Sequence, residues 1–288
     1  MDGPATGAPA VNGATLGLPP TQTAASEMPP TQTAASGVSP TQAAASGMPP
    51  THGLAGLLLL ADSRLPAGGH AHSGGAEEAC RTGAISGPGD LARFLRGRLA
   101  TAGRVAAALA WSACAAAQAF GRPDKEFQEP GTGGQAREAE TAWRLLDAEA
   151  DARIASPAQR LAGRTQGRLL IRTARRIWPS PALETLARAV PDGAHHPIAL
   201  GVAAQAAGCT PDQAAMAAAY TSVTGAATAA VRLLGLDPVT VHRLLAELPY
   251  DSVIAEQHDW SALPAHAAPA LDLLAEQHLR TEVRLFVS

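Results

Sequence analysis

Alanine is the feature that most limits the folds open to this chain. It occurs 66 times among 288 residues, whereas leucine, isoleucine, valine and phenylalanine together occur 54 times. Alanine has the highest helix propensity, and its small side chain lets helices approach one another closely. The sequence therefore predicts an all-α protein: a single Ala-rich helical domain with a thin core, whose helices bury part of their apolar surface against partners.

The N-terminal stretch, residues 1–52, repeats a unit of ten residues. Pro19–Ser26 recurs as Pro29–Ser36 and, slightly changed, as Ser39–Ser46. The stretch holds two charged residues and no aromatic residue. No face of the repeat is apolar enough to be buried in a solenoid, so we predict a disordered tail here.

Four helices are predicted by the same start signal, a capping residue followed by proline. The side-chain oxygen of the cap accepts a backbone N–H, and proline stands where an N–H would have no partner. The four pairs are Ser156-Pro157, Ser180-Pro181, Thr210-Pro211 and Asp237-Pro238. A further long helix is predicted from Pro88, because apolar residues repeat there at helical spacing, namely Leu91, Phe94, Leu95, Leu99, Ala102 and Val105.

Beyond residue 52, the sequence predicts one helical domain over 53–250 and a C-terminal extension over 251–288 that contains one helix. Sustained alternation of apolar and polar residues, which would indicate a strand, occurs only weakly, in Thr281–Val287.

Charge and apolar runs exclude several classes of protein. The net charge of −3 argues against a nucleic-acid-binding protein, which normally carries a basic patch. The longest strongly apolar run, Leu54–Ala61, is far shorter than a membrane span, and the N-terminus does not look like a secretory signal. Three separated cysteines show no disulfide or zinc pattern and fit a reducing compartment. We expect a cytoplasmic protein that does not bind membranes.

The sequence contains no catalytic motif: it lacks a phosphate-binding loop, a nucleophile elbow, a metalloprotease motif and a dinucleotide fingerprint. We therefore predict a protein that is not an enzyme. Cys80 and Cys114 fall on Ala-rich helical faces typical of inert core thiols. Trp111, Trp143 and Trp178 are interpreted as core or groove residues.

Two histidine pairs, His70 with His72 and His195 with His196, are the candidate metal ligands. Neither pair has a cysteine or carboxylate at chelating spacing, so ordinary loop and cap histidines are favoured over a stable metal site. One helix also carries a basic stripe, which is either a solvated face or a docking surface for an acidic partner. Its members are Arg168, Arg172, Arg175 and Arg176.

A longer motif lies in Ala61–Glu77, which reads ADSRLPAGGHAHSGGAE. It resembles the opening signature of the urease accessory protein UreF family, D-S-x-L-P-x-G-G-[F/H]-x-x-S-x-G-x-E. Two further stretches, His195–Val202 and Ala229–Leu233, are similar to later parts of the same family. The sequence departs from the family in Gly235–His242, where many members carry a polar Gly/Gln turn. In the signature, Asp62 and Ser63 can turn the chain after the first helix, and Ser73 can cap the next helix.

The resemblance implies a helical scaffold in urease maturation. Such proteins bind the accessory protein UreD, also called UreH, form homodimers and recruit the GTPase UreG, and the assembly delivers nickel to apo-urease. The GTPase binds the GTP and the complex handles the nickel, so no cofactor is expected to bind stably to this chain. The residues expected to contact partners are Asp62, Ser63, His70, His72, Ser73, Glu77 and Arg232.

Two alternatives remain open. The chain could be a metallochaperone that binds nickel through His70, His72 and one further ligand. It could also be a helical enzyme of a kind that its motifs do not reveal, although no acid, base and nucleophile cluster in the sequence.

Overall fold

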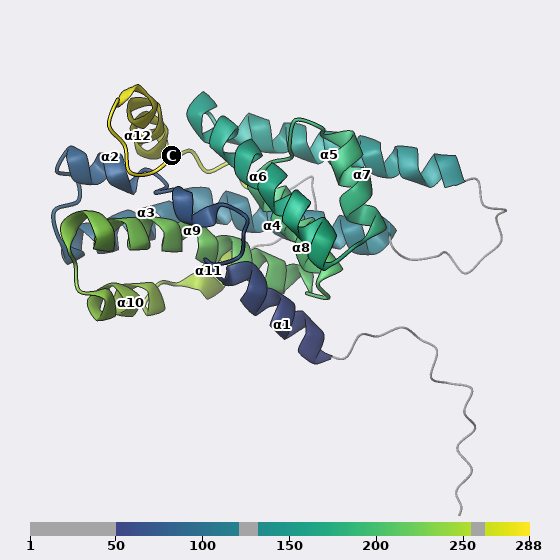
Figure 1. Ribbon diagram of the computed structural model, residues 1–288, viewed down its shortest axis with the longest axis horizontal. Coiled ribbons are helices and arrows are strands. Elements are labelled where there is room, and N and C mark those ends of the chain that lie inside the picture. The colour runs from purple at the N-terminus through teal and green to yellow at the C-terminus, as the bar shows by residue number, and fades with distance from the viewer. Residues whose placement is uncertain (1–49, 121–131, 255–262) are drawn as a thin grey trace, which may run out of the picture. The chain divides into compact units, whose positions relative to one another are not determined.

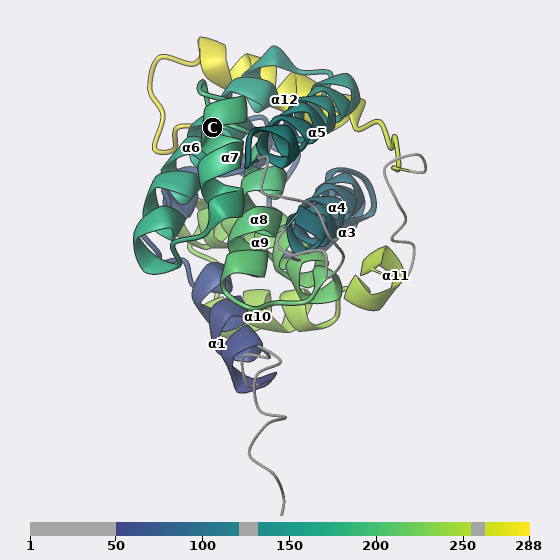
Figure 2. The same ribbon diagram turned by 90° about the vertical axis from the view of Figure 1, so that its right-hand side faces the viewer.

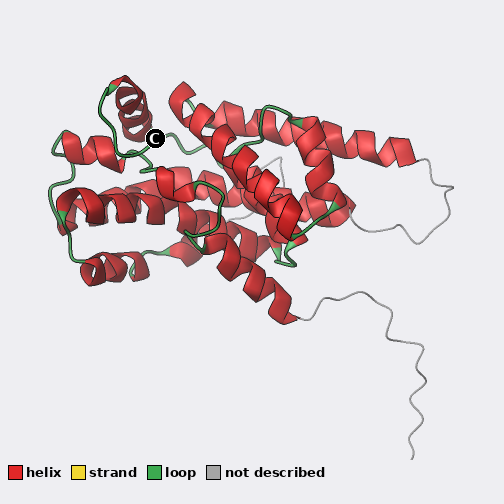
Figure 3. Ribbon diagram, viewed as in Figure 1, coloured by secondary structure: helices red, strands yellow, loops and turns green. Residues whose placement is uncertain are grey.

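The structure is a computed structural model that describes residues 50–120, 132–254 and 263–288. These residues form helices joined by loops, and no strand is assigned among them, which confirms the all-α prediction (Figure 3). The α-helices are α1 (Pro50–Ala61), α2 (Ala76–Arg81), α3 (Pro88–Arg98), α4 (Arg104–Phe120), α5 (Thr132–Arg153), α6 (Pro157–Ile177), α7 (Pro181–Ala189), α8 (His196–Ala206), α9 (Pro211–Leu234), α10 (Pro238–Ala246), α11 (Tyr250–Ile254) and α12 (Pro269–Arg280). Two short elements complete the order, the 3₁₀ turn η1 (Gly69–Ala71) and the π-helical turn η2 (Leu99–Gly103).

All four cap–proline signals start helices at the predicted residues. Ser156 Oγ and Ser180 Oγ each accept a backbone N–H at 3.2 Å, at the starts of α6 and α7. Thr210 forms a full capping box with Gln213 at the start of α9, and Asp237 accepts two backbone amides at the start of α10. These boundaries are correct because each depends on contacts within one helical turn.

The helix predicted from Pro88 is longer than its apolar pattern indicated. It runs through α3, η2 and α4 to Phe120, so the π turn interrupts the register without ending the helix. By length and composition alone, Pro88–Phe120 and Pro211–Leu234 could cross a membrane, and 56 % of each apolar window is buried inside the fold. Burial of this extent is typical of core helices in a folded domain.

Close packing of Ala-rich helices builds the core, with α4 lying against both α8 and α9 (Figures 1 and 2). Two glycines permit the nearest approaches. A Cβ on Gly201 of α8 would lie 2.2 Å from the carbonyl oxygen of Ala110 in α4, and one on Gly167 of α6 would lie 1.8 Å from that of Ala194. No side chain larger than hydrogen fits at either contact, which agrees with the predicted close packing.

The C-terminal part packs onto the helical body. The described residues from Pro50 to Ser288 form one compact unit, in which α12 contacts α2 and α6 (Figure 1). Glu276 of α12 accepts hydrogen bonds from Ser156 Oγ at 2.6 Å and from the Ala158 amide at 2.9 Å. The stretch predicted as a C-terminal extension, 251–288, holds α12 and most of α11, which begins at Tyr250. Of the tail predicted over 1–52, residues 1–49 lie outside the described residues, and α1 begins at Pro50.

Candidate partner-binding site

The loop after α1 contains the first part of the signature motif. Asp62 turns the chain as predicted: its carboxylate accepts the Arg64 backbone N–H at 2.9 Å and pairs with the Arg64 guanidinium at 2.8 Å. These hydrogen bonds lower the pKa of the Asp62 carboxyl below its usual value. Thr173 of α6 donates its hydroxyl to the carbonyl of Pro66 at 2.8 Å, which fixes the loop on α6. Ser63 is exposed.

The next two motif residues, His72 and Ser73, are buried and contact the C-terminal residues. The Ser73 amide and hydroxyl both donate to the backbone oxygen of Ser288, at 2.5 and 2.9 Å. His72 Nδ1 lies 2.5 Å from Ser288 Oγ, and the Val287 amide donates to the carbonyl of Ala71 at 2.7 Å. The sequence predicted that Ser73 caps α2, and this prediction is wrong because the Ser73 hydroxyl binds Ser288 instead. The cap position belongs to Gly75, which has a φ of 88° and no side-chain cap.

Glu77 holds the same C-terminal segment from the first turn of α2. Its two carboxylate oxygens accept the backbone amides of Leu285 at 2.7 Å and Phe286 at 3.1 Å. His278 of α12 also lies near, with Nδ1 3.7 Å from Glu77 Oε2, and its Nε2 lies 3.2 Å from the carbonyl oxygen of Phe286. We call these contacts of His72, Ser73 and Glu77 with residues 285–288 the C-terminal clasp.

A cavity of about 690 Å³ lies beside the clasp. Asp62, Ser63, His72 and Arg232 line it, together with His196 at the start of α8. Burial, with a smaller contribution from the nearby His72, lowers the pKa of His196 to about 4. His196 is therefore neutral at physiological pH.

Most of the residues that the sequence selected lie either in the cavity lining or in the clasp. Asp62, Ser63, His72 and Arg232 share the cavity, whereas Ser73 and Glu77 bind the C-terminal residues. Arg232, in the last turn of α9, is exposed. The side chain of His70 lies outside the described part of the structure. Whether these residues contact partners stays a prediction.

A second polar cluster lies between α5, α6 and the start of α8, and of its members only His195 was selected from the sequence. Asp147, Asp151 and His195 place one ligand atom each within 4.8 Å of one another, the geometry of a possible metal site. The guanidinium group of Arg164 supplies the positive charge between the two carboxylates. Its nitrogen atoms lie 2.8 Å from an oxygen of Asp147 and 2.6 Å from an oxygen of Asp151. His195 Nε2 lies 2.8 Å from Asp151 Oδ1, and Asp147 Oδ1 accepts the His195 amide at 3.0 Å. We call these four residues the Asp–His–Arg cluster.

Each carboxylate oxygen of Asp147 and Asp151 already has a hydrogen-bond partner within the cluster. The cluster is therefore an internal ion-pair network between these two carboxylates and Arg164. Burial lowers the pKa of His195, although its hydrogen bond with Asp151 opposes the shift. A signal for the cluster existed in the sequence: Asp147 and Asp151 are four residues apart and so share one helical face. Their partner His195 is 44 residues beyond Asp151 and could not be assigned from spacing.

The cysteines and tryptophans that the sequence placed on buried faces lie in or against the core, namely Cys80, Cys114, Trp111, Trp143 and Trp178. Cys114 is fully buried, and burial raises the pKa of its thiol to about 12. Cys80 is partly buried, with its pKa raised for the same reason. Trp143 is fully buried, and Trp178 packs against the same core.

The described residues therefore define a helical protein in which one polar site, the clasp, binds the C-terminal residues of the same chain. Comparison with known proteins gives the family. Residues 85–249 match the UreF family model. The chain is 42 % identical over 238 residues to the urease accessory protein UreF of Mycolicibacterium vanbaalenii, covering 82 % of this chain and 99 % of that protein. It is 40 % identical to the protein of that name in Mycobacterium marinum and 37 % identical to that of Mycobacterium tuberculosis, each over 235 residues, with the same shares covered.

These similarities show that the chain belongs to the UreF family of urease accessory proteins. The family predicted from the Asp62–Glu77 signature is thus confirmed, and membership of this family is consistent with the predicted role in urease maturation.

Proposed function

We propose that this chain is a cytoplasmic scaffold that bridges the accessory protein UreD, also called UreH, and the GTPase UreG. In this proposal it works as a homodimer within the complex and promotes GTP-dependent insertion of nickel into apo-urease. Nickel is the cargo of the complex, and GTP is bound by the partner GTPase. The chain itself contributes binding surfaces and performs no catalytic step.

The observation that carries this proposal is the construction of the signature motif in a chain of the UreF family. Asp62, Ser63, His72 and Arg232 line one cavity, and the clasp holds the adjoining loop in a fixed conformation. A preformed loop loses less conformational entropy when a partner binds it. The arrangement suits a protein that acts by presenting a surface.

Co-purification tests the proposal directly. The full chain, expressed with UreD and UreG from the same source, is expected to retain both and to activate urease. Glu77→Ala and Arg232→Ala are expected to weaken assembly and activation together. Glu282→Ala and Arg243→Ala serve as matched controls because both side chains are exposed and lie outside the clasp and the cavity lining. Failure of the unmodified chain to retain either partner would remove the main support for a scaffold.

A second candidate function is a metallochaperone that binds nickel through His70 and His72. One observation favours it: His72 and His196 line the same cavity, and the neutral imidazole of His196 is the form that ligates transition metals. His196 would then supply the further ligand that the sequence left unnamed.

Equilibrium dialysis against Ni²⁺ separates the two functions. Micromolar or tighter binding that is lost in a His70→Ala/His72→Ala variant supports the metallochaperone, and its loss in His196→Ala supports the third ligand. Absence of binding in the unmodified chain, with both partners still retained, favours the scaffold.

A further inference from the structure

Helix α6 carries arginine at every fourth position along most of its length. The residues are Arg160, Arg164, Arg168, Arg172 and Arg176. Four residues advance a helix by about 6 Å and by little more than one turn, so neighbouring members of this series lie close to one another. Like charges at this spacing disfavour the helix, which makes the series unusual unless the charges have partners.

The first members of the series bind acceptors within the chain. Arg160 donates to the carbonyl of Ile154 at 2.9 Å. Arg164 belongs to the Asp–His–Arg cluster. Arg168 reaches only a backbone carbonyl, that of Asp192, at 3.4 Å. After Arg164, the arginines of this series therefore have fewer and weaker hydrogen-bond partners within the chain.

The later members have no ion-pair partner among the described residues. Arg168, Arg172 and Arg176 are all exposed, and no carboxylate within the described ranges pairs with them. Interaction with the helix dipole favours arginine in the last turn, which includes Arg176 but not Arg168 or Arg172. We call these three residues the α6 arginine stripe.

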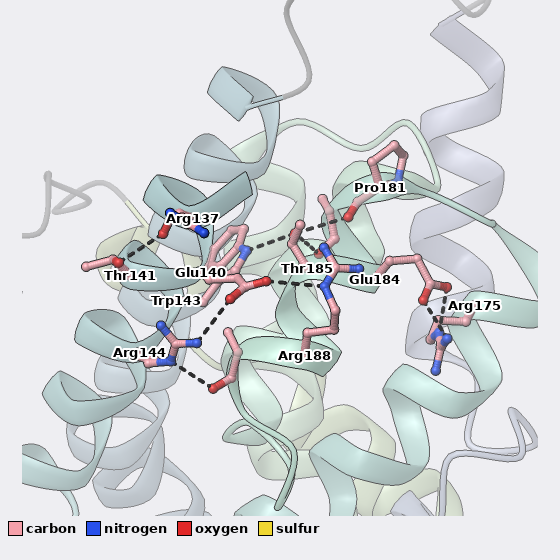
Figure 4. A network of polar contacts seen from close by, with 12 residues as sticks. Arg137, Glu140, Thr141, Trp143, Arg144, Arg175, Pro181, Glu184, Thr185 and Arg188 are labelled. Carbon is pink, nitrogen blue, oxygen red and sulfur yellow. Dashed lines mark hydrogen bonds and ion pairs between the residues drawn. The ribbon is translucent and has the colours of Figure 1, made fainter. Parts of the chain in front are cut away.

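Arginines nearby show the opposite pattern. Arg175, on the same helix, pairs with Glu184 of α7 at 2.5 Å, and Glu140 of α5 pairs with both Arg144 and Arg188 (Figure 4). Carboxylates are thus available on this side of the molecule and are already engaged by other guanidinium groups. The three arginines of the α6 arginine stripe, in contrast, form no ion pair with any carboxylate among the described residues.

The stripe also adjoins the signature loop. Leu169 lies between two of its members and meets Gly68, where an added Cβ would lie 2.9 Å from Leu169 Cδ1. Thr173, next to Arg172, donates to Pro66 in the same loop. Leu161, seven residues before Arg168, lies on the same face of α6 by helical geometry and is 61 % exposed. This face of α6 therefore presents one exposed apolar side chain beside three regularly spaced positive charges.

From this geometry we propose that the α6 arginine stripe is a docking surface for an acidic helix of a protein partner. Carboxylates four residues apart on a partner helix repeat at the same spacing of about 6 Å, which matches the stripe. Arginine binds carboxylates with two parallel hydrogen bonds and is enriched at interfaces. The inference rests on the proposed function in taking the partner to be a component of the urease-activation complex.

The first test uses a defined probe. An alanine-based helical peptide of about 20 residues with glutamate at every fourth position is compared with its glutamine counterpart. The full chain is expected to bind the glutamate peptide at low salt and to bind the glutamine peptide at least tenfold more weakly. R168E/R172E/R176E is expected to lose at least tenfold in affinity for the glutamate peptide.

A matched control changes the net charge equally at three exposed arginines on α3, α5 and α10, namely R96E/R137E/R243E. It is expected to bind as the unmodified chain does. Equal loss in both triple variants would show a general charge effect and overturn the proposal, as would tighter binding to a DNA duplex than to the glutamate peptide. If R168E/R172E/R176E fails to fold, R168Q/R172Q/R176Q replaces it in the binding experiment. Thermal melting of each variant shows whether it is folded.

The second test measures binding to purified UreD, UreG and apo-urease at two salt concentrations. The glutamate variant is expected to lose at least tenfold in affinity for one component, with a weaker salt dependence. If this variant binds all three components normally, the proposal that the α6 arginine stripe is a docking surface is overturned, whereas the proposed scaffold function still stands. An unmodified chain that binds the glutamate peptide but none of the components overturns the scaffold instead, and binding to neither overturns both.

Discussion

Two adjacent histidines at the start of α8 face two regions that are built in different ways. His195 joins the Asp–His–Arg cluster, where side-chain charges from α5 and α6 satisfy one another. His196 faces the cavity beside the C-terminal clasp, where a carboxylate and a hydroxyl bind backbone groups of residues 285–288. The first region joins core helices, whereas the second holds a terminal segment on the surface of the body.

The difference predicts different responses to damage. Loss of a group in the cluster leaves a buried charge or amide without a partner, and the cost falls on the whole fold. Loss of a group in the clasp frees a segment that can reach water, so the cost stays local. Four experiments examine this contrast, beginning with the largest expected effect.

Gly167→Ala should destabilise the cluster region most. The new Cβ would lie 1.8 Å from the Ala194 carbonyl oxygen, so α6 must move away from the residues that precede α8. We expect a loss of about 3 kcal/mol or more in the free energy of unfolding, measured by urea denaturation. Gly97→Ala on α3 is the control, since nothing lies within 4 Å of its added Cβ, and it should stabilise by up to about 1 kcal/mol. Equal stability of the two variants would contradict the close approach.

Asp147→Asn tests the charge network itself with little change in shape. The substitution removes the charge that faces Arg164 while leaving one acceptor for the His195 amide. Because Asp147 is buried, we expect a loss of about 2 to 3 kcal/mol in the free energy of unfolding. Glu184→Gln breaks the exposed pair with Arg175 and should cost less than about 1 kcal/mol. If the two variants melt alike, the cluster is no more than a surface ion pair.

The contrast between the regions also explains what the sequence could predict. Ser156, Ser180, Thr210 and Asp237 cap helices as predicted because their partners lie two or three residues away. Ser73 has the same side chain as two of these caps, yet its hydroxyl binds Ser288, 215 residues along the chain. A local rule cannot distinguish the two outcomes, because the competing acceptor becomes available only after the chain has folded.

The candidate site follows the same division. Its family and most of its residues could be identified from the ordered motif in Ala61–Glu77, whose spacing is local. The clasp could not, since the weak alternation in Thr281–Val287 does not say which element it meets. The structure pairs that segment with the motif through Glu77 and Ala71.

Acid should weaken the fold through His196. Its pKa in the folded protein, about 4, lies below the usual value of about 6.5, so the unfolded chain binds the proton more readily between these values. Stability should therefore fall as the pH decreases from 6.5 towards 4, with about 2 kcal/mol lost at pH 5 from this group. Urea denaturation at pH 7.5 and pH 5, compared with His196→Gln, isolates the effect. Parallel pH dependence in the two proteins would show that His196 titrates normally.

Glu77→Gln should produce the smallest and most local change, and it tests the clasp directly. A glutamine keeps one acceptor oxygen but presents an N–H₂ group to the other backbone amide, so either Leu285 or Phe286 loses its partner. We expect about 1 kcal/mol of local destabilisation, seen as roughly fivefold faster hydrogen exchange over residues 281–288, while the global unfolding midpoint changes little. Glu282→Gln, at an exposed position of the same segment, should leave the exchange unchanged. A global loss of stability in Glu77→Gln would mean that the clasp, like the cluster, is part of the cooperative core, and the distinction between the two regions would fail.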